Sequence, residues 1–351
     1  MKLYTCSNCN NLLYFENSIC LKCKQPLGFD PEKLDIITLA AEKVQGVYRD
    51  IANHKFRYRF CENAQYGTCN WVIPETNDSP FCLACQLNRT IPVLSEVNLE
   101  RWKRIEVAKH RLVYSLLRLG LPLKAKTEES DEGIAFDFLA NSSPDIKVLT
   151  GHNDGVITLN IEEADEALRV RNKLDLGERY RTLLGHFRHE IGHYYWDMRI
   201  KSHAILNQFR ELFGDENQNY EESLKTYYAN GAKPNWAEEF ISPYATAHPW
   251  EDWAESWSHY LHLMDTLETA YYFGIGVHPN RQTGVKSLEL EMERDPYTVK
   301  DFEKVFKMWL PLTFAVNSLN RSMGHQDFYP FIIGDKVVNK LRFIHDLCKA
   351  K

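Results

Sequence analysis

The stretch GHFRHEIGHYYWD, residues 185–197, contains three histidines and a glutamate. Among them, His189, Glu190 and His193 form an H-E-x-x-H motif. On a helix the two histidines are separated by about 6 Å of rise, so both imidazoles can reach one zinc ion. Glu190 beside them can polarise a water molecule on that ion. The motif predicts a catalytic metal site, although so short a pattern also occurs by chance.

The residues around the motif repeat with the period of an amphipathic helix, at about 100° per residue. His186, His189, Glu190 and His193 fall on one face. The opposite face is apolar and consists of Leu184, Phe187, Ile191, Tyr195 and Met198. A solvated face would explain the polarity but not the choice of three histidines, so we favour metal binding. For His186 we favour a place in the cleft over binding of a second ion.

A second helix is predicted in AHPWEDWAESWSHYLH, residues 247–262, where Pro249 suits the first turn. Its apolar stripe consists of Trp253, Trp257, Tyr260 and Met264. Glu251 and Glu255 share the polar face, with Asp252 on the flank. One glutamate can join the two histidines as third ligand, and the other can accept a hydrogen bond from a ligand imidazole. His262 also lies on the polar face, but about 16 Å along the helix from Glu251, too far to bind the same ion.

Eight of the nine cysteines form two groups of four in the first 90 residues. The first group is a pair of C-x2-C knuckles, whose four thiolates can complete a tetrahedron around one ion. The second is looser, because seven residues separate its first two cysteines. The groups are Cys6, Cys9, Cys20 and Cys23, and then Cys61, Cys69, Cys82 and Cys85. Iron fits the first spacing as well, but zinc is the commoner occupant, so we expect two structural zinc ions and one catalytic zinc ion.

Composition narrows the possible partners of this chain of 351 residues. A net charge of −6 gives no basic field for nucleic acid, and no window of ~18 apolar residues predicts a membrane span. The first residues lack the features of a signal peptide, so we expect a cytoplasmic protein with reduced cysteines. In HKFRYRF, residues 54–60, basic and aromatic residues alternate, which favours a half-buried strand over a nucleic-acid surface.

We expect an α+β fold to position the candidate metal ligands. We expect a zinc-ribbon region with two four-cysteine sites over residues 1–90, and a mostly helical zincin-like domain with a small β-sheet over 91–351. Helical periodicity begins over Leu99–Leu119, and residues 146–161 predict a β-hairpin with Asn153, Asp154 and Gly155 between its arms. The second arm of that hairpin could pair with an extended peptide.

The H-E-x-x-H motif followed by a helix with E-x-x-x-E resembles the gluzincin metallopeptidases, and EDWAESW is especially similar to the third-ligand helix of their lethal-factor-like branch. This resemblance implies that Glu251 binds zinc, that Glu255 supports a ligand, and that Tyr244, seven residues before Glu251, stabilises the oxyanion. Nearly the whole chain resembles the bacterial family of zinc-ribbon putative zinc-binding metallopeptidases. Besides the first cysteine group, the matching stretches are FCLACQLNRTIP, LLGHFRHEIGHYYWD, HPWEDWAESWSHYLH, LNRSMG and DFYPF.

The sequence therefore predicts a zinc metallopeptidase that acts on a peptide or protein, with Glu190 as general base. One alternative is a zinc-ribbon adaptor or regulatory protein with an inactive zincin body, against which the intact Glu190 argues. Another is a zinc hydrolase that cleaves a different amide bond. The ribbons could dock a protein partner. His248 and His259 could contact the oxyanion, but a structural role is at least equally expected.

Overall fold

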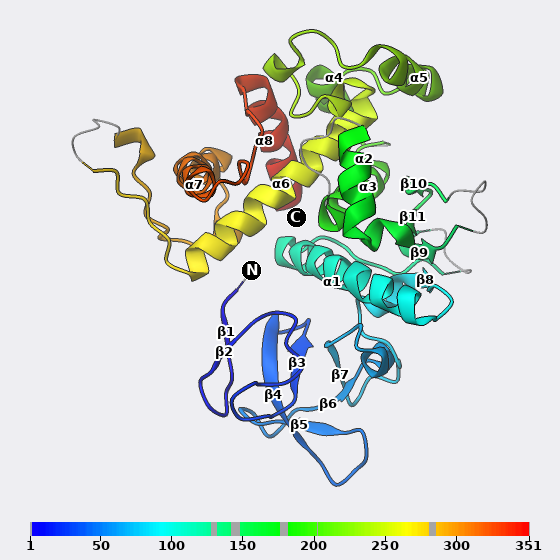
Figure 1. Cartoon of the computed structure of the whole chain (residues 1–351), viewed down its shortest axis with the longest axis vertical. Coiled ribbons are helices and arrows are strands. Elements are labelled where there is room, and N and C mark those ends of the chain that lie inside the picture. The colour runs from blue at the N-terminus through cyan, green and yellow to red at the C-terminus, as the bar shows by residue number, and fades with distance from the viewer. Residues whose placement is uncertain are drawn as a thin grey trace. The chain divides into compact units, whose positions relative to one another are not determined.

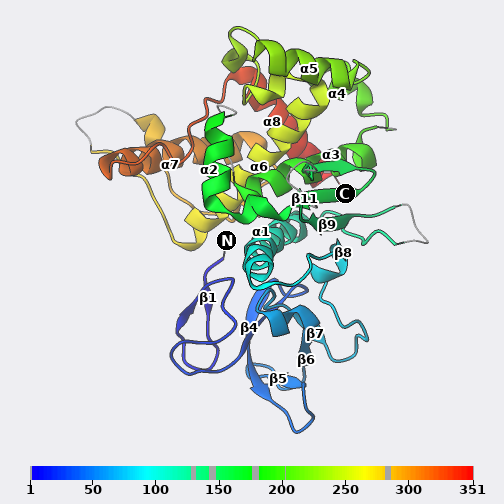
Figure 2. The same cartoon turned by 45° about the vertical axis from the view of Figure 1, so that its right-hand side comes forward.

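The computed structural model describes residues 2–127, 132–141, 148–175, 182–201, 203–280 and 286–350. The chain divides into two compact units. One runs to the end of α2 (Glu166–Asp175) and includes Thr182–Phe187, and the other contains the described residues from Arg188 onward. Figures 1 and 2 label the helices and strands of both. A β-rich region with two groups of four cysteines precedes a mostly helical part with a small sheet, which confirms the predicted α+β class. The predicted boundary at residue 90 stays a prediction.

The N-terminal region consists of short antiparallel strands. Strands β1 (Tyr4–Thr5) and β2 (Leu12–Leu13) pair with each other. A five-stranded sheet follows in the order β3-β4-β5-β6-β7. Its strands are β3 (Leu27–Asp30), β4 (Asp35–Ala41), β5 (Tyr48–Asp50), β6 (Arg57–Phe60) and β7 (Val72–Pro74). Strand β6 confirms the strand predicted within residues 54–60, and its Tyr58 is buried with Ile37, Leu39 and Val72.

Helix α1 (Glu96–Leu119) confirms the helix predicted from residue 99. The Ser95 side chain accepts a hydrogen bond from the backbone N–H of Asn98 at its start. Gly120 ends the helix at φ 68°, in the left-handed region where glycine is favoured. The buried face of α1 includes Trp102, Ile105, Val113 and Leu116.

The same unit contains a second sheet in the order β10-β11-β9-β8. Its strands are β8 (Asn88–Thr90), β9 (Ala135–Leu139), β10 (Gly151–Asn153) and β11 (Val156–Asn160). The predicted hairpin is confirmed, because β10 and β11 are antiparallel and Asn153 pairs with Val156. Asp154 and Gly155 turn the chain at φ 46° and 74°, as a two-residue hairpin turn requires. Residues 146 and 147 of the predicted first arm lie outside the described residues, and pairing with a peptide stays a prediction.

The remaining elements are mostly helical. They are α3 (Leu183–Arg199), α4 (Leu206–Phe213), α5 (Tyr220–Asn230), α6 (Pro249–Tyr272), α7 (Phe302–Ser322) and α8 (Asp335–Lys349). Helix α6 is the centre of its unit, in contact with α4, α7 and α8 (Figure 1). The predicted stripe of Trp253, Trp257, Tyr260 and Met264 is fully buried. No helix within the described ranges is long and apolar enough to cross a membrane.

Candidate metal centres

Three potential metal ligands converge where α3 and α6 meet. The donor atoms of His189, His193 and Glu251 all lie within 4.8 Å of one another. His189 Nε2 is 3.2 Å from His193 Nε2 and 3.0 Å from Glu251 Oε2, and His193 Nε2 is 3.6 Å from Glu251 Oε1. Donors at the corners of a tetrahedron around zinc are separated by about 3.4 Å. This nitrogen, nitrogen and oxygen set therefore fits a catalytic zinc ion.

The close approach of α3 and α6 depends on Gly192, inside the H-E-x-x-H motif. A Cβ atom at this position would lie 3.2 Å from the Cα of Ala254 and 3.2 Å from the Cβ of Trp257. The indole N–H of Trp253 donates to the Gly192 carbonyl at 2.8 Å. The glycine thus lets the helix that carries both histidines lie directly against the helix that carries Glu251.

Glu255 lies on the other side of the His189 ring. His189 Nδ1 donates to Glu255 Oε1 at 2.8 Å, and the Ser242 hydroxyl donates to Glu255 Oε2 at 2.5 Å. With its proton on Nδ1, the imidazole presents the lone pair of Nε2 to the donor cluster. Glu251 shares that cluster with both histidines, whereas Glu255 does not. The predicted roles of ligand for Glu251 and support for Glu255 gain support from this geometry.

Electrostatics couples the two glutamates to the histidines. Burial alone would lower the pKa of His189, but hydrogen bonds and charges from Glu251 and Glu255 outweigh burial and raise it well above its usual range. Burial alone would raise the pKa of Glu251, but His193 and His189 lower it to about 2. A zinc ligand must present a free lone pair, so His189 would bind zinc as the neutral imidazole, with its proton on Nδ1 and its lone pair on Nε2.

Two residues predicted to assist catalysis border the same site. Glu190 follows His189 on α3 and is partly exposed. Tyr244 begins the short 3-10 turn at Tyr244–Thr246, and its ring centroid is 6.0 Å from that of His189. Burial and the charge of Glu251 raise the pKa of Tyr244, so its hydroxyl stays protonated and able to donate.

Sequence analysis missed Tyr220, the first residue of α5. Its hydroxyl donates to Glu251 Oε1 at 2.7 Å, and its ring packs on His248 and Trp250 with centroids 5.2 and 5.7 Å away. Burial and the charge of Glu251 raise the pKa of Tyr220. It lies 31 residues before Glu251, and no motif or helical period connects the two positions.

We expect Tyr220→Phe to weaken zinc binding at the catalytic centre by ~10–100-fold, as the loss of a partner of a metal ligand generally does. The phenylalanine keeps the ring packing and removes only the hydrogen bond to Glu251. Competition with a chromophoric chelator measures the effect. Tyr14→Phe is the control for loss of a tyrosine hydroxyl, because Tyr14 is 63% exposed and follows β2 in the N-terminal region. Equal zinc affinities of the two variants would exclude this role for Tyr220.

The other histidines near the site, and Asp252, have partners of their own. His248 caps α6 by accepting from the Trp250 N–H, and His259 Nδ1 is 2.8 Å from the Tyr329 hydroxyl. His262 contacts Arg188. In the first unit, His186 Nδ1 is 2.6 Å from Glu163 Oε2. Asp252 forms a buried ion pair with Lys340 of α8 at 2.6 Å, and lies outside the three-donor group.

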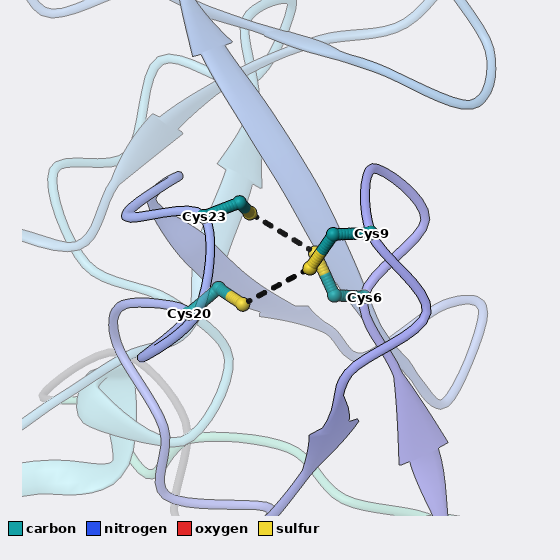
Figure 3. Close-up of side chains that lie close together, drawn as sticks. All are labelled: Cys6, Cys9, Cys20 and Cys23. Carbon is teal, nitrogen blue, oxygen red and sulfur yellow. Dashed lines mark hydrogen bonds between the residues drawn. The ribbon is translucent and has the colours of Figure 1, made fainter.

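The first cysteine group is formed by two similar turns (Figure 3). The sulfur atoms of Cys6 and Cys23 are 3.6 Å apart, as are those of Cys9 and Cys20. In each turn a backbone N–H bonds back to the carbonyl of the first cysteine, from Asn10 and Lys24 respectively, at 2.8 and 2.9 Å. Sulfur atoms around a tetrahedral zinc ion are about 3.8 Å apart. The group fits a structural zinc ion.

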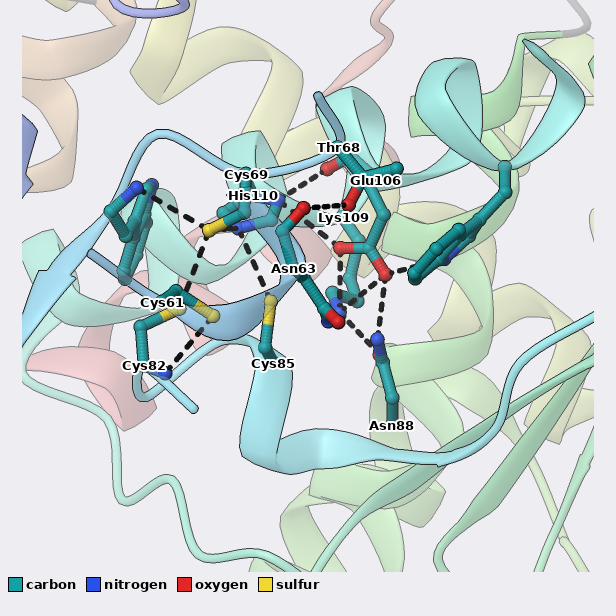
Figure 4. Close-up of polar contacts among 12 residues, drawn as sticks. Cys61, Asn63, Thr68, Cys69, Cys82, Cys85, Asn88, Glu106, Lys109 and His110 are labelled. Carbon is teal, nitrogen blue, oxygen red and sulfur yellow. Dashed lines mark hydrogen bonds and ion pairs between the residues drawn. The ribbon is translucent and has the colours of Figure 1, made fainter. Parts of the chain in front are cut away.

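The second cysteine group is equally close despite its wider spacing (Figure 4). All four sulfur atoms lie within 4.8 Å of one another, and those of Cys69 and Cys82 are 3.7 Å apart. The seven residues between Cys61 and Cys69 form a 3-10 turn over Glu62–Tyr66, which Gly67 ends at φ 68°. The extra residues therefore fold into a local turn, and the group fits a second structural zinc ion.

We expect three zinc ions per purified chain, one in each group of four cysteines and one at His189, His193 and Glu251. Elemental analysis with parallel protein quantification measures the ratio. A ratio of two, with free thiols in the second cysteine group, would show that this group binds no zinc ion. A ratio of one would contradict the proposed organisation.

Two family descriptions and a set of relatives match this chain. Residues 98–347 match the family described as "Putative zinc-binding metallo-peptidase", and residues 3–96 match a zinc-ribbon domain. Uncharacterized proteins from Mycobacterium bovis and Mycobacterium tuberculosis are each 39% identical over 349 residues, covering 98% of this chain and 94% of the relative. No solved structure matches.

Proposed function

Because the chain belongs to the putative zinc-binding metallopeptidase family, we propose that it is a zinc-dependent peptidase of the gluzincin type. The observation that carries this proposal is the convergence of His189, His193 and Glu251 with Glu190 adjacent to the first ligand. Three protein ligands leave a fourth position open, as in catalytic rather than structural zinc sites.

Each remaining role belongs to a residue of this chain. A zinc ion held by the two histidines and Glu251 would supply a Lewis acid and lower the pKa of a water molecule. Glu190 would take the proton of the attacking water and deliver it to the leaving amine. Tyr244 would donate a hydrogen bond to the developing oxyanion. Glu255, held by Ser242, would keep the His189 imidazole in the tautomer that binds metal.

The two cysteine centres would stabilise a region built of short strands. We further propose that the protein is cytoplasmic and that its substrate is a peptide or protein. Neither a membrane nor a nucleic acid would be a partner, and the zinc ribbons could dock a protein. The free cysteines, of which eight form two metal-binding groups, and the net charge of −6 support this proposal.

The experiment that tests the proposal is parallel profiling of the zinc-loaded chain on a peptide library and on a library of small amides. We expect new peptide termini, loss of cleavage after treatment with a chelator, and recovery on addition of zinc. Ammonia release from the amides without peptide cleavage would support the amidase alternative. No hydrolysis of either library would leave the adaptor alternative.

A further inference from the structure

The second cysteine centre has a fifth potential ligand, which its cysteine spacing does not reveal. His110 of α1 is 4% exposed and places Nε2 3.3 Å from Cys69 Sγ and 3.9 Å from Cys85 Sγ. Figure 4 shows both contacts, on the side of the centre that faces α1. The ring therefore lies beside one edge of the sulfur tetrahedron.

The hydrogen bonds of His110 determine which of its ring nitrogens faces the sulfur atoms with a lone pair. Nδ1 lies 2.6 Å from the backbone carbonyl of Glu106 and 3.3 Å from the Glu106 carboxylate. Since these oxygens only accept, Nδ1 carries the proton, and in the neutral ring Nε2 presents its lone pair to Cys69 and Cys85. Histidine ligands of metal ions are commonly oriented by the same kind of Nδ1–H···O contact.

A buried polar network fixes this orientation. The Glu106 carboxylate is fully buried and accepts hydrogen bonds from the Trp102 indole at 3.0 Å and the Asn88 amide at 2.7 Å. Lys109, also fully buried, is 2.8 Å from Glu106 Oε2. A buried charge pair with several hydrogen-bond partners holds its neighbours in one arrangement, so the His110 ring has little freedom to turn away.

The same corner of the centre borders a cavity. A cavity of about 300 Å³ is lined by Cys69 and His110, together with Phe15, Phe60, Thr68 and Asn70. Cys69 is 9% exposed, whereas Cys61, Cys82 and Cys85 are 1–3% exposed. An electrophile that enters the cavity therefore meets the sulfur of Cys69 first.

We propose that His110 is a reserve zinc ligand, which replaces Cys69 when that sulfur is removed or blocked. Blocking by an alkyl halide forms a sulfur–carbon bond and releases halide. The zinc–sulfur bond then breaks, and a bond from His110 Nε2 to zinc takes its place, with no change of oxidation state. The centre would pass from four thiolates to three thiolates and one imidazole, and both are established structural zinc sets.

Metal content of full-length variants tests this exchange. Starting from three zinc ions in the unaltered chain, we expect three in His110→Ala and three in Cys69→Ala. We expect only two in Cys69→Ala/His110→Ala, because that variant lacks both the thiolate and the imidazole. Cys61→Ala is the matched control and should also bind two, since among the described residues the imidazole contacts of this centre are to Cys69 and Cys85. With cobalt in place of zinc, Cys69→Ala should shift the ligand-field bands to shorter wavelength and weaken the sulfur-to-cobalt charge-transfer band.

Three outcomes would overturn the proposal. Cys69→Ala could lose the ion as Cys61→Ala does, the double variant could keep it, or the unaltered chain could bind no metal at this centre.

Should Cys69→Ala fail to fold, iodoacetamide labelling of the zinc-loaded chain replaces it. Chains alkylated at Cys69 should then keep three zinc ions when His110 is present, and lose one in His110→Ala. Equal zinc loss from both alkylated proteins would exclude the reserve ligand. All readouts are metal content or metal spectra, so they do not depend on peptidase activity.

Discussion

Glu190→Gln is expected to reduce peptide hydrolysis by ~10²–10⁴-fold while the catalytic zinc stays bound. The amide has nearly the shape of the carboxylate but cannot accept a proton from the attacking water. Glu190 is outside the group formed by His189, His193 and Glu251, so its replacement leaves the donor set complete. Initial cleavage rates and zinc content, measured on the same preparations, separate a loss of chemistry from a loss of metal.

A control on the same helix strengthens this comparison. Asp197→Asn removes one negative charge from α3, where Asp197 pairs with the exposed Lys201 at 3.1 Å. Its activity should match that of the unaltered chain. If Glu190→Gln also retained full activity with a full complement of zinc, Glu190 would not be the base and the proposed mechanism would be wrong.

Glu251→Ala is expected to empty the catalytic centre, whereas Glu255→Ala is expected to keep it filled. The first change leaves two histidines, and a chelator at modest concentration should remove zinc from them. The second leaves all three ligands but removes the acceptor of the His189 Nδ1 proton at 2.8 Å. Affinity or activity should then fall by ~10–100-fold. Zinc content should be two ions in Glu251→Ala and three in Glu255→Ala.

The two cysteine centres serve as the internal control for folding, because their ions should remain in both variants. If Glu255→Ala emptied the site while Glu251→Ala kept it filled, the two roles would be reversed. Asp252→Ala should keep all three ions, although it leaves Lys340 buried without its partner and should lower the melting temperature. Loss of the catalytic ion in Asp252→Ala would point to an aspartate ligand and contradict the gluzincin assignment.

Local patterns in the sequence predicted the elements with strong periodicity. The helix predicted over Leu99–Leu119 follows from the period of its apolar residues, and the structure extends it to Glu96. The hairpin follows from alternation in its second arm and from the turn residues Asn153, Asp154 and Gly155. The H-E-x-x-H motif likewise lies on a helix, α3. In these segments local preference and tertiary packing favour the same structure.

Such local patterns do not show which of the two glutamates is the zinc ligand and which supports an imidazole. Glu251 and Glu255 share one face of α6, and a helical wheel treats them alike. What distinguishes them is the position of His189, which contacts Glu251 through Nε2 and Glu255 through Nδ1. That distinction depends on how α3 packs on α6, and the apolar repeat within one helix does not determine this packing.

Two further residues were missed for a related reason. Tyr220 reaches Glu251 across 31 residues, and His110 reaches Cys69 across 41 residues. Neither pair has a fixed spacing that chemistry requires, unlike two histidines one helical turn apart. Single tyrosines and histidines are common in chains of this length, so only the folded structure identifies these two.

Hydrolysis of peptides in H2¹⁸O is the most direct test of the central claim that this chain is a zinc-dependent peptidase. The zinc-loaded chain and its Glu190→Gln variant would be incubated with the same peptide library, and the products analysed by mass spectrometry. The account predicts new C-termini that carry ¹⁸O with the unaltered chain, and at least ~10²-fold fewer of them with Glu190→Gln. New termini in equal amounts from both proteins, or none from a chain that holds zinc at His189, His193 and Glu251, would contradict it.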